Sequence, residues 1–413
     1  MEKYSEYKDS GIQSIGKIPN HWEVRHLRNF LTLFSEKGFG HSQLLSVTRE
    51  KGVIIRDKEN KEENHNFVPD DLSGYKHLYP GDFVINKMKS WQGSYGVSEY
   101  EGIVSPAYFT CKLKGVNPQF FSLAIRSKAY IGFFMQYSKG IRVDQWDLDP
   151  NSMKDIPFIL PPLDEQLKIV PYLDESLSKI DEAIAQQQKM IDLLNERKQI
   201  IINNAVTKGL DSNAPMKDSG VDWIGMIPEH WRLIQYRHLF YNLDKLREPI
   251  TADKRSRNNP QYDYYGASGV IDKIDYYNVN DKVLLIGEDG ANLLMRNLPL
   301  IYKAEGKFWV NNHAHILKPI HDDYDFLAYV MEAADYTLYI TGSAQPKLSQ
   351  ANLNSVKLPI PPLNEQIKIR EYIFRSIKPL EKAILKCQNQ ITLLQERKQI
   401  IINEVVTGKV KVS

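Results

Sequence analysis

Residues 193–202 read LLNERKQIII and residues 393–402 read LLQERKQIII, so ten positions return 200 positions later with one change. A stretch kept this closely within one chain indicates an internal repeat, and a repeat governs the whole architecture. The same surface present twice in one chain suggests that something identical binds it twice.

The segments on the N-terminal side of these decamers are paired as well. PPLDEQLKI at 161–169 returns as PPLNEQIKI at 361–369, again 200 positions later. DSGIQSIGKIPNHW at 9–22 returns as DSGVDWIGMIPEHW at 218–231, which is 209 positions later. The chain is therefore a duplicated unit that shares its leading segment and its tail, while the region between them is nine residues shorter in the second copy.

The two tails are expected to be long helices. Their apolar positions alternate spacings of three and four residues, the pattern of a coiled-coil seam, and matching seams in one chain can pack on each other. The seam positions are Leu177, Ile180, Ile184, Gln187, Ile191, Leu194, Lys198, Ile201 and Ala205, and then Ile377, Leu380, Ile384, Cys387, Ile391, Leu394, Lys398, Ile401 and Val405.

The ends of both helices carry recognisable signals. Asp164 and Asn364 follow two prolines and a leucine, and their side chains can accept hydrogen bonds from the free amides of a first turn. Gly209 and Gly408 suit a left-handed terminus.

Other positions in the tails are less regular. Pro171 and Pro379 predict a kink or a broken first turn. The triplets Ile200–Ile202 and Ile400–Ile402 point around nearly the whole helix, so this end is expected to be covered on all sides. The cover is either the protein's own globule, which is favoured, or a partner subunit.

The regions between the repeats share almost no letters but keep a similar order of elements. Strand-like runs are QLLSV, GVIIR, DFVIN and YFTCKL in the first region, and KVLLIG and HAHILKP in the second. Helix-like stretches follow at Asn117 to Tyr137 and at Asp323 to Ile340. The predicted fold class is α+β, with globular domains at 1–160 and 210–359 and helical segments at 161–209 and 360–413.

Composition sets only loose bounds. The chain has 413 residues and a formal net charge of +2, which neither supports nor excludes nucleic-acid binding. Its two cysteines, Cys111 and Cys387, are expected to be buried small hydrophobes in a reducing compartment. The sequence contains no long apolar run and its start MEKYSEYKDS is charged, so a soluble cytoplasmic protein is expected.

Two dissimilar globules, two tails of the form PPLxEQ…LLxERKQIIIN and a leading IGxIPxHW resemble the specificity subunit of a type I DNA restriction-modification system. The resemblance covers essentially the whole chain. It implies two target-recognition domains, each reading one half of a bipartite DNA target, separated by two antiparallel helices that form a spacer. Two enzymes that modify opposite strands need a local dyad, and a dyad perpendicular to a helix pair also makes the pair antiparallel.

The resemblance also implies partners. Two adenine methyltransferase subunits would dock on the helices, and restriction/translocase subunits would join through them. S-adenosylmethionine, ATP and magnesium are expected on those partners and not on this chain. The residues assigned to docking are Glu196, Arg197, Lys198, Glu396, Arg397 and Lys398, although a solvated, ion-paired face is the plainer alternative.

Loops that combine cations with polar or aromatic side chains are the candidates for contact with DNA. In the first globule they are NKMKSWQGSYG, which resembles a segment of this family's recognition domains, and KGIRVDQWD. The candidate residues are Lys87, Lys89, Trp91, Gln92, Tyr95, Arg142 and Gln145. Trp91 could equally well close the core.

The second globule offers a corresponding set. Its candidates are Gln345 and Lys347 in GSAQPKLSQ, the cations Lys254, Arg255, Arg257 and Arg296, and His313. The acidic pair Glu288 and Asp289 is interpreted as a turn in preference to a cytosine contact. His313 and His315 alternate along a predicted strand, where polar packing or DNA contact is favoured over a metal.

The sequence argues against an enzyme. Its Pro-Pro pairs precede helices and lack the polar residue of a methyltransferase tetrad, and no G-x-x-x-x-G-K-[ST] loop is present. The expected role is therefore a non-catalytic DNA reader. The alternative is a duplicated helix-pair scaffold that binds only proteins, and gel shifts with and without the methyltransferase would separate the two.

Overall fold

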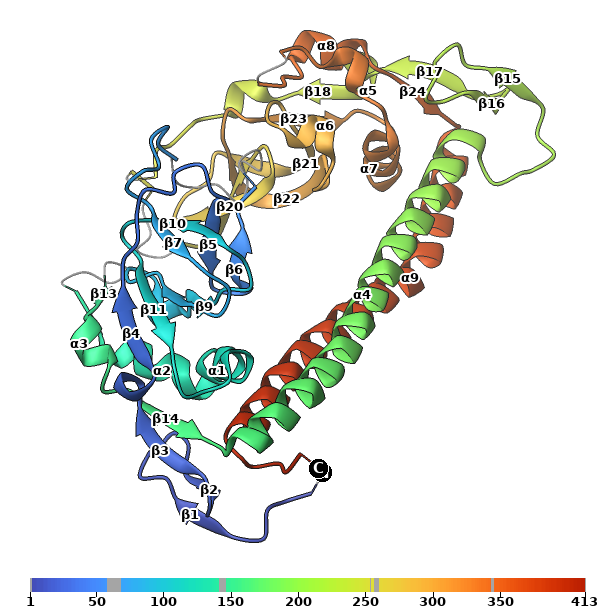
Figure 1. The fold of residues 1–413 in the computed structure, drawn as a ribbon. Helices are drawn as coiled ribbons and strands as arrows, with labels where there is room; N and C mark the ends of the chain where they lie inside the picture. The colour runs from blue at the N-terminus through green and yellow to red at the C-terminus, as the bar shows by residue number, and fades with distance from the viewer. Residues whose placement is uncertain are drawn as a thin grey trace. The chain divides into compact units, whose positions relative to one another are not determined.

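The computed structural model divides into two compact units, each of which is described here by itself (Figure 1). Unit 1 consists of Met1–Gln187 and Asn389–Ser413, and unit 2 is the continuous stretch Gln188–Gln388. The structure describes residues 2–57, 68–140, 146–252, 254–255, 260–342 and 345–412.

The elements that start in unit 1 alternate short strands with short helices. The strands are β1 Tyr7–Asp9, β2 Lys17–Pro19, β3 Glu23–His26, β4 Leu31–Phe34, β5 Leu45–Thr48, β6 Gly52–Ile55, β7 Lys76–Leu78, β8 Phe83–Ile85, β9 Tyr95–Val97, β10 Gly102–Val104, β11 Phe109–Leu113, β12 Ser138–Lys139, β13 Asp147–Leu148 and β14 Pro157–Leu160. The helices are η1 Leu27–Asn29, η2 Ser90–Gln92, α1 Pro118–Ile125, α2 Lys128–Gln136, α3 Pro150–Met153 and α4 Leu163–Lys208.

Unit 1 is built on an antiparallel sheet in the order β4-β11-β8-β9. The four strand-like runs expected from the sequence form β5, β6, β8 and β11. Aromatic side chains fill the core behind this sheet, where Phe83 and Phe121 meet edge to face at 5.1 Å and Tyr95 stacks on Phe134 at 4.1 Å. The apolar faces of α1 and α2 therefore cover one side of the sheet.

The remaining elements start in unit 2. The strands are β15 Met216–Asp218, β16 Met226–Pro228, β17 Arg232–Gln235, β18 Phe240–Asn242, β19 Tyr262–Gly266, β20 Gly269–Ile274, β21 Val279–Gly287, β22 Ile301–Val310, β23 Ala314–Pro319 and β24 Lys357–Ile360. The helices are α5 Tyr236–Leu239, η3 Asp244–Leu246, α6 Asn292–Met295, α7 Tyr324–Ala333, η4 Thr337–Tyr339, α8 Gln350–Ser355 and α9 Leu363–Val406.

Unit 2 contains a longer mixed sheet in the order β18-β23-β21-β22-β19-β20. Its pairs are antiparallel except β19 with β22. The expected strands KVLLIG and HAHILKP form β21 and β23, which pair with each other near the middle of the sheet. The α+β class predicted from the sequence is confirmed, and the two globules are unlike in sheet order as well as in sequence.

The repeated motifs that flank each globule contact each other. In unit 1 the indole Nε1 of Trp22 donates to the carboxylate of Glu165 at 3.0 Å, and in unit 2 Trp231 donates to Glu365 at 3.1 Å. Both tryptophans are fully buried, so each carboxylate satisfies an indole donor that water cannot reach. The shared letters of IPxHW and PPLxEQ are therefore the two halves of one structural joint.

The glutamine of the second motif ties the globule to its long helix. The Gln166 side chain accepts from the backbone amide of Asn117 at 2.8 Å, and Gln366 accepts from the amide of Asp323 at 2.9 Å. Asn117 and Asp323 are the N-cap residues of α1 and α7. The same amide side chain thus anchors the first helix after the sheet in both units, although the globules differ.

Within unit 1 the start of α4 packs against the end of α9. Lys398 Nζ lies 2.7 Å from Asp181 Oδ1, and nearer the start of α4 Leu173 shares a buried core with Val405. Residue numbers rise along one helix while they fall along the other, so the two segments are antiparallel.

In unit 2 the end of α4 packs against the start of α9. Lys198 Nζ lies 2.7 Å from Glu381 Oε1, and Ala205 shares a core with Ile373. The expected antiparallel seam is confirmed in each unit, since every predicted seam position is buried or half-buried.

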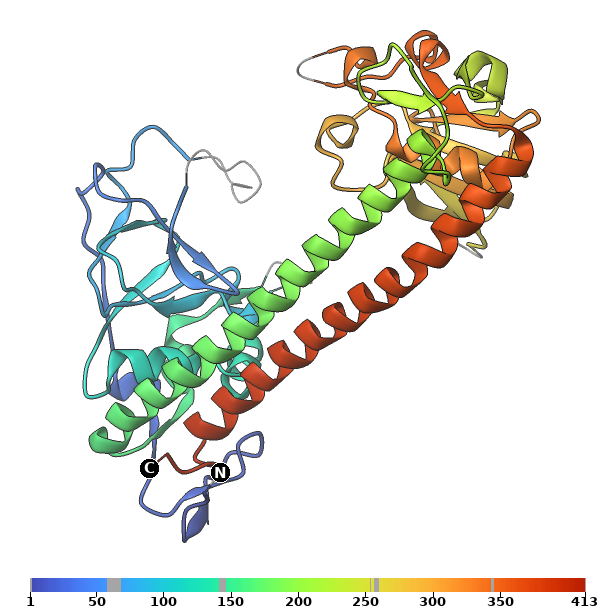
Figure 2. The ribbon, with the colours of Figure 1, turned by 90° about the vertical axis from the view of Figure 1, so that its right-hand side faces the viewer.

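The first and last described residues of unit 1 lie side by side, as Figure 2 shows. The backbone amide of Lys411 donates to the carbonyl of Glu2 at 2.9 Å. Lys409 Nζ donates to the carbonyl of Ile15 at 2.8 Å. The expectation that the N-terminus lies near the end of the second long helix is confirmed.

The N-terminal ends of the two long helices differ from the prediction, whereas their C-terminal ends agree with it. α4 begins at Leu163 and α9 at Leu363, so Asp164 and Asn364 lie inside the first turn and the predicted capping position is wrong. The carbonyl of Pro162 instead accepts the first helical hydrogen bonds, at 3.1 and 3.0 Å. A proline can hold this position because it contributes only its carbonyl.

The prolines inside the helices do not break them. α4 continues through Pro171 and α9 through Pro379, so the broken first turn expected there is wrong. Both prolines are exposed, and the carbonyls that lose a partner can bind water. The predicted termini are confirmed, because Gly209 has φ 74° directly after α4 and Gly408 has φ 70° two residues after α9.

Two further expectations are corrected. The helix expected over 117–137 is split into α1 and α2 by a turn at Arg126 and Ser127, and the one expected over 323–340 ends as α7 at Ala333. The isoleucine triplets are not covered all round, since Ile200 is 51% exposed and Ile400 is 54% exposed.

Cys111 and Cys387 are free and buried, as expected. Burial raises the pKa of the Cys111 thiol to about 12. Over the described ranges, the helices lack the combination of length and apolarity that crossing a bilayer requires.

Candidate nucleic-acid interface

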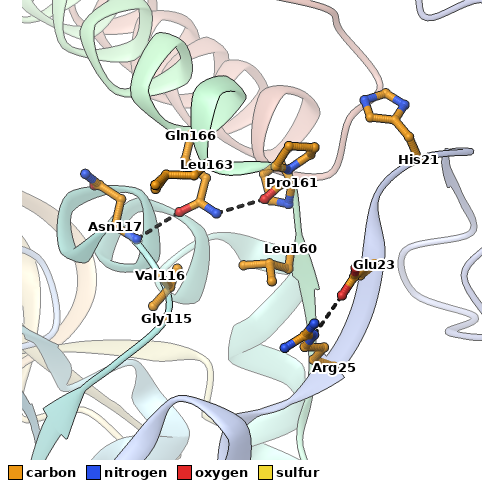
Figure 3. A pocket seen from close by; sticks show the side chains of 11 residues that line it. His21, Glu23, Arg25, Gly115, Val116, Asn117, Leu160, Pro161, Leu163 and Gln166 are labelled. Carbon is orange, nitrogen blue, oxygen red and sulfur yellow. Dashed lines mark hydrogen bonds and ion pairs between the residues drawn. The ribbon is translucent and has the colours of Figure 1, made fainter.

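A hollow of about 490 Å³ lies in unit 1 beside the start of α4 (Figure 3). It is lined by His21, Glu23, Arg25, Gly115, Val116, Asn117, Leu160, Pro161, Pro162, Leu163 and Gln166. Arg25 donates to Glu23 at 2.7 Å, so the two charges compensate each other. The hollow contains the joint between globule and helix and none of the residues predicted to contact DNA.

The first predicted DNA loop, residues 86–94, follows β8 and is held in shape by its own backbone. The amide of Asn86 donates to the carbonyl of Ser94 at 3.0 Å, which closes the loop. The Ser90 hydroxyl lies 3.2 Å from the hydroxyl of Ser138 on β12. The loop is therefore preformed and is attached to β12.

The two lysines of this loop are in different situations. Lys87 pairs with Asp147 of β13 at 2.7 Å, so part of its charge is compensated within the protein. Lys89 is exposed at the tip next to Met88, whose side chain is also exposed. Of the two, Lys89 is the better placed to attract a phosphate.

The aromatic part of the loop is only partly accessible. The Trp91 indole donates to the carbonyl of Met88 at 3.2 Å, and its ring lies 5.4 Å from the ring of Trp146. Trp91 and Gln92 are both half-buried. Both side chains are therefore only partly open to solvent.

Tyr95 was predicted to contact DNA, and this prediction is wrong. Its side chain is completely buried in β9 and stacks on Phe134. Burial raises the pKa of the Tyr95 hydroxyl well above its ordinary value. Arg142 and Gln145, the other candidates of this globule, lie outside the described residues.

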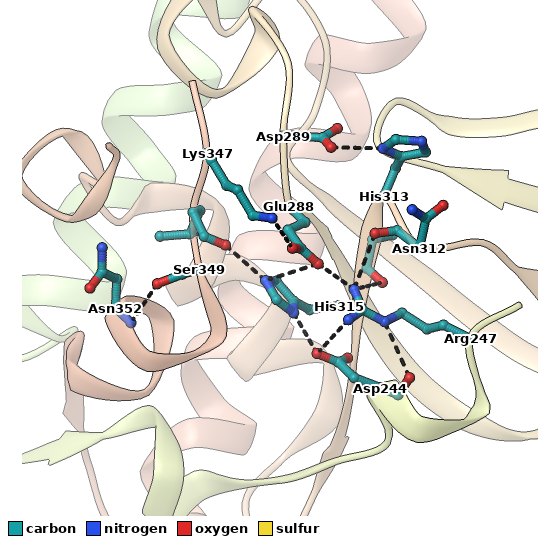
Figure 4. A network of polar contacts seen from close by, with 12 residues as sticks. Asp244, Arg247, Glu288, Asp289, Asn312, His313, His315, Lys347, Ser349 and Asn352 are labelled. Atoms are coloured by element: carbon teal, nitrogen blue, oxygen red, sulfur yellow. Dashed lines mark hydrogen bonds and ion pairs between the residues drawn. The ribbon is translucent and has the colours of Figure 1, made fainter. Parts of the chain in front are cut away.

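In unit 2 the loop after β21, with Glu288 and Asp289, lies beside the loop before α8, with Lys347 (Figure 4). Backbone hydrogen bonds join the two loops. The amide of Leu348 donates to the carbonyl of Glu288 at 2.7 Å, and the amide of Gly290 donates to the carbonyl of Pro346 at 3.0 Å. The expected turn at Glu288 and Asp289 and the predicted DNA loop GSAQPKLSQ, which are far apart in sequence, therefore form one surface.

The acidic residue at the start of this surface is neutralised by cations. Arg247 donates to Glu288, and Lys347 Nζ lies 3.0 Å from its other oxygen. Burial raises the pKa of Glu288, but the hydrogen bonds from Arg247 and Lys347 outweigh it and the net effect lowers the pKa. The loop is therefore not a free anionic patch that would repel DNA.

Several predicted residues meet at the rim of this surface. His313 Nδ1 lies 2.7 Å from Asp289, and both Gln345 and Lys347 are exposed in the neighbouring loop. The structure thus places polar and cationic groups on two adjacent loops, which is a composition suited to base edges and phosphates.

His315 does not share the rim with His313. It is 1% exposed, and Asp244 lies 2.6 Å from its Nδ1. The described residues contain no group of three or more His, Cys, Asp or Glu side chains that could hold a metal ion.

Two predicted arginines have structural roles. Arg296 donates to the backbone carbonyls of Glu332 at 3.1 Å and Ala334 at 2.5 Å, at the end of α7. Arg255 donates to Asp272 at 3.0 Å.

The Arg255 guanidinium also stacks on Tyr264, whose ring centroid is 4.3 Å away, and its side chain is 16% exposed. Its assignment to DNA is corrected, because a cation held in this way is not available to a phosphate. Lys254 is exposed next to it, and Arg257 lies outside the described residues.

The residues predicted to dock a partner divide into two kinds. Lys198 and Lys398 are used in the ion pairs between the helices, whereas Glu196, Arg197, Glu396 and Arg397 are exposed. Exposed apolar side chains share that surface of the helices, at Met190, Leu193 and Ile200 on α4 and at Leu393 and Ile400 on α9.

The sequence interpretation missed both Arg247 and Asp244. These residues hold the unit 2 loops through contacts with Glu288 and His315. The alternation along β23 indicates that a buried His315 needs a polar partner, but it does not identify that partner. The exposed leucines could have been found from the sequence, because both decamers keep apolar residues at positions outside the predicted seam.

Comparison with known proteins supports one family. Residues 240–391 match the model described as Type I restriction modification DNA specificity domain. The chain is 24% identical to the putative type I restriction enzyme MjaX specificity subunit of Methanocaldococcus jannaschii, over 98% of each. It is 26% identical to the type I restriction enzyme MjaVIII specificity subunit of the same organism, over 98% of this chain and 97% of that one.

A solved chain of a type I R-M system, studied for complex assembly and conformational transition, has a similar fold. It is 14% identical, with a TM-score of 0.65, and the alignment covers 95% of this chain and 99% of that chain.

Proposed function

We propose that the chain is a type I restriction-modification DNA specificity subunit, the non-catalytic subunit that selects the DNA sequence, because a family model and two full-length relatives are similar to it. Each globule would read one half of a bipartite target. The helix pair would set the gap between the halves and dock two adenine methyltransferase subunits, with restriction subunits joining through these. A cytoplasmic location is part of the same proposal, because the DNA is there.

We call the repeated flanking segments and their long helices the frame, and each globule between them an insert. The observation that carries this proposal is the contrast between the repeated frame and the unlike inserts. The Trp22–Glu165 and Trp231–Glu365 joints are nearly identical, while the sheets between them differ in order and length. A repeated frame suits two copies of one partner, and unlike inserts suit two different half-sites. A scaffold that bound only proteins would have no need of unlike inserts.

Both inserts offer a preformed polar surface for DNA. In unit 1 it is the loop with exposed Lys89 and half-buried Trp91, and in unit 2 it is the rim formed by His313, Gln345 and Lys347. Phosphate contacts would position each globule, and polar side chains would distinguish bases.

Cofactor chemistry would belong to the partners. The hollow beside α4 is lined by the compensated Arg25–Glu23 pair, by polar side chains such as His21, Asn117 and Gln166, and by apolar side chains. We propose that S-adenosylmethionine, ATP and magnesium bind the methyltransferase and restriction subunits.

The experiment is a matched pair of exchanges. Arg25 pairs with Phe158 between β3 and β14, and Ile234 pairs with Leu358 between β17 and β24, so cuts at these residues preserve both strand pairs. Replacing 25–158 by the insert of another family member should change one half of the methylated sequence. Replacing 234–358 should change the other half.

Genome-wide mapping of methylated adenines in cells that express the chain with its methyltransferase would report the result. A change of both halves by one exchange would contradict the modular reading. Gel shifts that show no sequence-selective retention, with or without the partner, would favour the scaffold alternative.

A further inference from the structure

The histidine at the centre of the unit 2 surface has acceptors at both ring nitrogens (Figure 4). His315 Nδ1 lies 2.6 Å from Asp244 Oδ2, and Nε2 lies 2.8 Å from the backbone carbonyl oxygen of Leu348. A carboxylate at this distance and a carbonyl oxygen both require an N–H. A neutral imidazole has one N–H, whereas the imidazolium has two.

We propose that His315 is a charged positioning residue, whose imidazolium holds the DNA-contacting loop of unit 2 in place, so that the grip on this half-site weakens when the histidine loses its proton. This inference rests on the proposed function of unit 2 as a DNA reader. It names His315 as the residue that holds the loop in place, and it states that the loop is held less firmly when this residue is neutral.

The surroundings favour the charged form. Facing His315 are the carboxylates of Asp244 on η3 and of Glu288 after β21, whose Oε2 is 3.9 Å from Nε2. Arg247 contacts both carboxylates, and Lys347 contacts Glu288.

At the rim, Asp289 pairs with His313. A neutral His315 would place two lone pairs against each other at one of its contacts.

The carbonyl that His315 holds belongs to the end of the loop that carries Gln345 and Lys347. Leu348 is also held by its amide on the carbonyl of Glu288 at 2.7 Å, so both polar groups of one residue are fixed to the strand side of the site. Thr341 and Lys347 exchange two backbone hydrogen bonds across the same loop, at 2.9 and 2.8 Å. Release of the Leu348 carbonyl would free one of the two ties at the base of this loop.

The counterpart loop in unit 1 is fixed differently. Among the described contacts, residues 86–94 are held by the backbone, by the Ser90–Ser138 hydroxyl pair and by the Lys87–Asp147 ion pair. Lysine and aspartate ordinarily keep their charges across the neutral range. The pH effect is therefore expected at the unit 2 half-site and not at the unit 1 half-site.

The charge itself is tested without DNA. The full chain, labelled with ¹⁵N in its histidine rings, would be observed by NMR at about pH 7, where an ordinary histidine is largely neutral. The signals lost in His315→Gln identify this residue. Two protonated ring nitrogens are expected, and one unprotonated nitrogen would overturn the inference.

The positioning role is tested by affinity against pH. The chain with its methyltransferase would bind a duplex with both mapped half-sites, and a second duplex with the unit 2 half-site scrambled, from about pH 6 to about pH 9. Affinity for the first duplex should fall about tenfold across this range, as expected for one charge-assisted hydrogen bond. Affinity for the second duplex should change much less.

Three variants separate this role from a structural one. His315→Gln should bind the full target about tenfold more weakly at low pH and lose the pH dependence. Asp244→Asn, which keeps an oxygen acceptor but removes the charge that faces the ring, should move the fall in affinity to lower pH. His313→Gln should keep the pH dependence, because that residue lies on the rim.

The outcomes of these measurements are distinct. A pH-independent affinity of the native protein would overturn the positioning role, and so would a pH dependence that survives in His315→Gln. Failure of both duplexes to bind selectively at every pH would instead reject the proposed function, while the NMR result would still decide the charge of His315.

Discussion

The carboxylate of Glu165 accepts a hydrogen bond from the indole of Trp22 at 3.0 Å, although 143 positions separate the two residues. Tyr4 donates to the same carboxylate at 2.7 Å. Burial raises the pKa of Glu165, but the hydrogen bonds from Tyr4, His21 and Trp22 outweigh it, so the pKa is lowered overall.

The lowered pKa predicts acid sensitivity of unit 1. A carboxylate with a depressed folded-state pKa stabilises the fold above its unfolded pKa, and this contribution is lost as the pH falls through the folded value. Urea unfolding should therefore show declining stability below about pH 4.3, the ordinary value of glutamate. Glu165→Gln should lose about 1–2 kcal/mol at neutral pH and should be less acid-sensitive.

Asp164→Asn is the matched control for that experiment, since Asp164 is the exposed neighbour within the same turn. Its free energy of unfolding should stay within about 0.5 kcal/mol of the native value. Equal losses in the two variants would contradict the role assigned to the Trp22 joint.

The exposed lysine of the unit 1 loop predicts a change in salt dependence. Lys89→Ala should weaken binding to all sequences and reduce the slope of log affinity against log salt by about one. Asp147→Asn should have the opposite effect, because it frees Lys87 from its 2.7 Å ion pair. Lys179→Ala, on the exposed face of α4, should leave the slope unchanged, and an unchanged slope in Lys89→Ala would remove Lys89 from the interface.

The contact between the chain ends predicts that a circular permutant folds. The amide of Lys411 and the carbonyl of Glu2 are 2.9 Å apart, so a linker of about three residues from Ser413 to Met1 would span the join. New ends at the exposed residue Asp211 would fall between α4 and β15. The permutant should melt within a few degrees of the native chain and keep its target, and an insoluble product would count against the arrangement.

We use the word stripe for the exposed apolar side chains of Leu193 and Ile200 on α4 and of Leu393 and Ile400 on α9. The stripe predicts where methyltransferase subunits dock. Leu193 and Ile200 are each 51% exposed, so replacing both by Ser should leave the melting temperature nearly unchanged. If the stripe is a docking surface, native mass spectrometry should then find one methyltransferase per chain instead of two. The same change at Leu393 and Ile400 should remove the other copy, and both pairs together should remove both.

Leu163→Ser supplies the control for that series. Leu163 is 60% exposed at the start of α4, away from the stripe. It should keep both copies. Two bound copies in all of the stripe variants would mean that the partner uses another surface.

The repeat, the long helices and their seam could be predicted because their signal is local and periodic. The alternation of three and four residues fixes which side of a helix is apolar, and the two offsets align the copies without any three-dimensional information. The prolines were less informative. A helix tolerates Pro171 where the lost hydrogen bond faces solvent, and the sequence does not say which carbonyl that is.

The candidate site was harder to predict because its contacts connect distant segments. Tyr95 stands in a polar loop sequence, but the strand that follows turns its ring into the core. The local sequence around Arg255 indicates a free cation, but Asp272 and Tyr264 lie beside it in the fold. Which cation remains available depends on pairings that no local pattern contains.

Unit 1 needs the last part of the chain, because Val405 and Val406 belong to its core and Gly408 lies against the Trp22 joint. A Cβ at Gly408 would meet Pro19 at 2.3 Å, so only glycine lets the tail close on the leading segment. On the ribosome, unit 2 is fully available once residue 388 has emerged, whereas the first segment to be synthesised must wait for the final 25 residues, Asn389–Ser413. A nascent chain cut short by a premature stop would thus release a finished second half attached to an open first half.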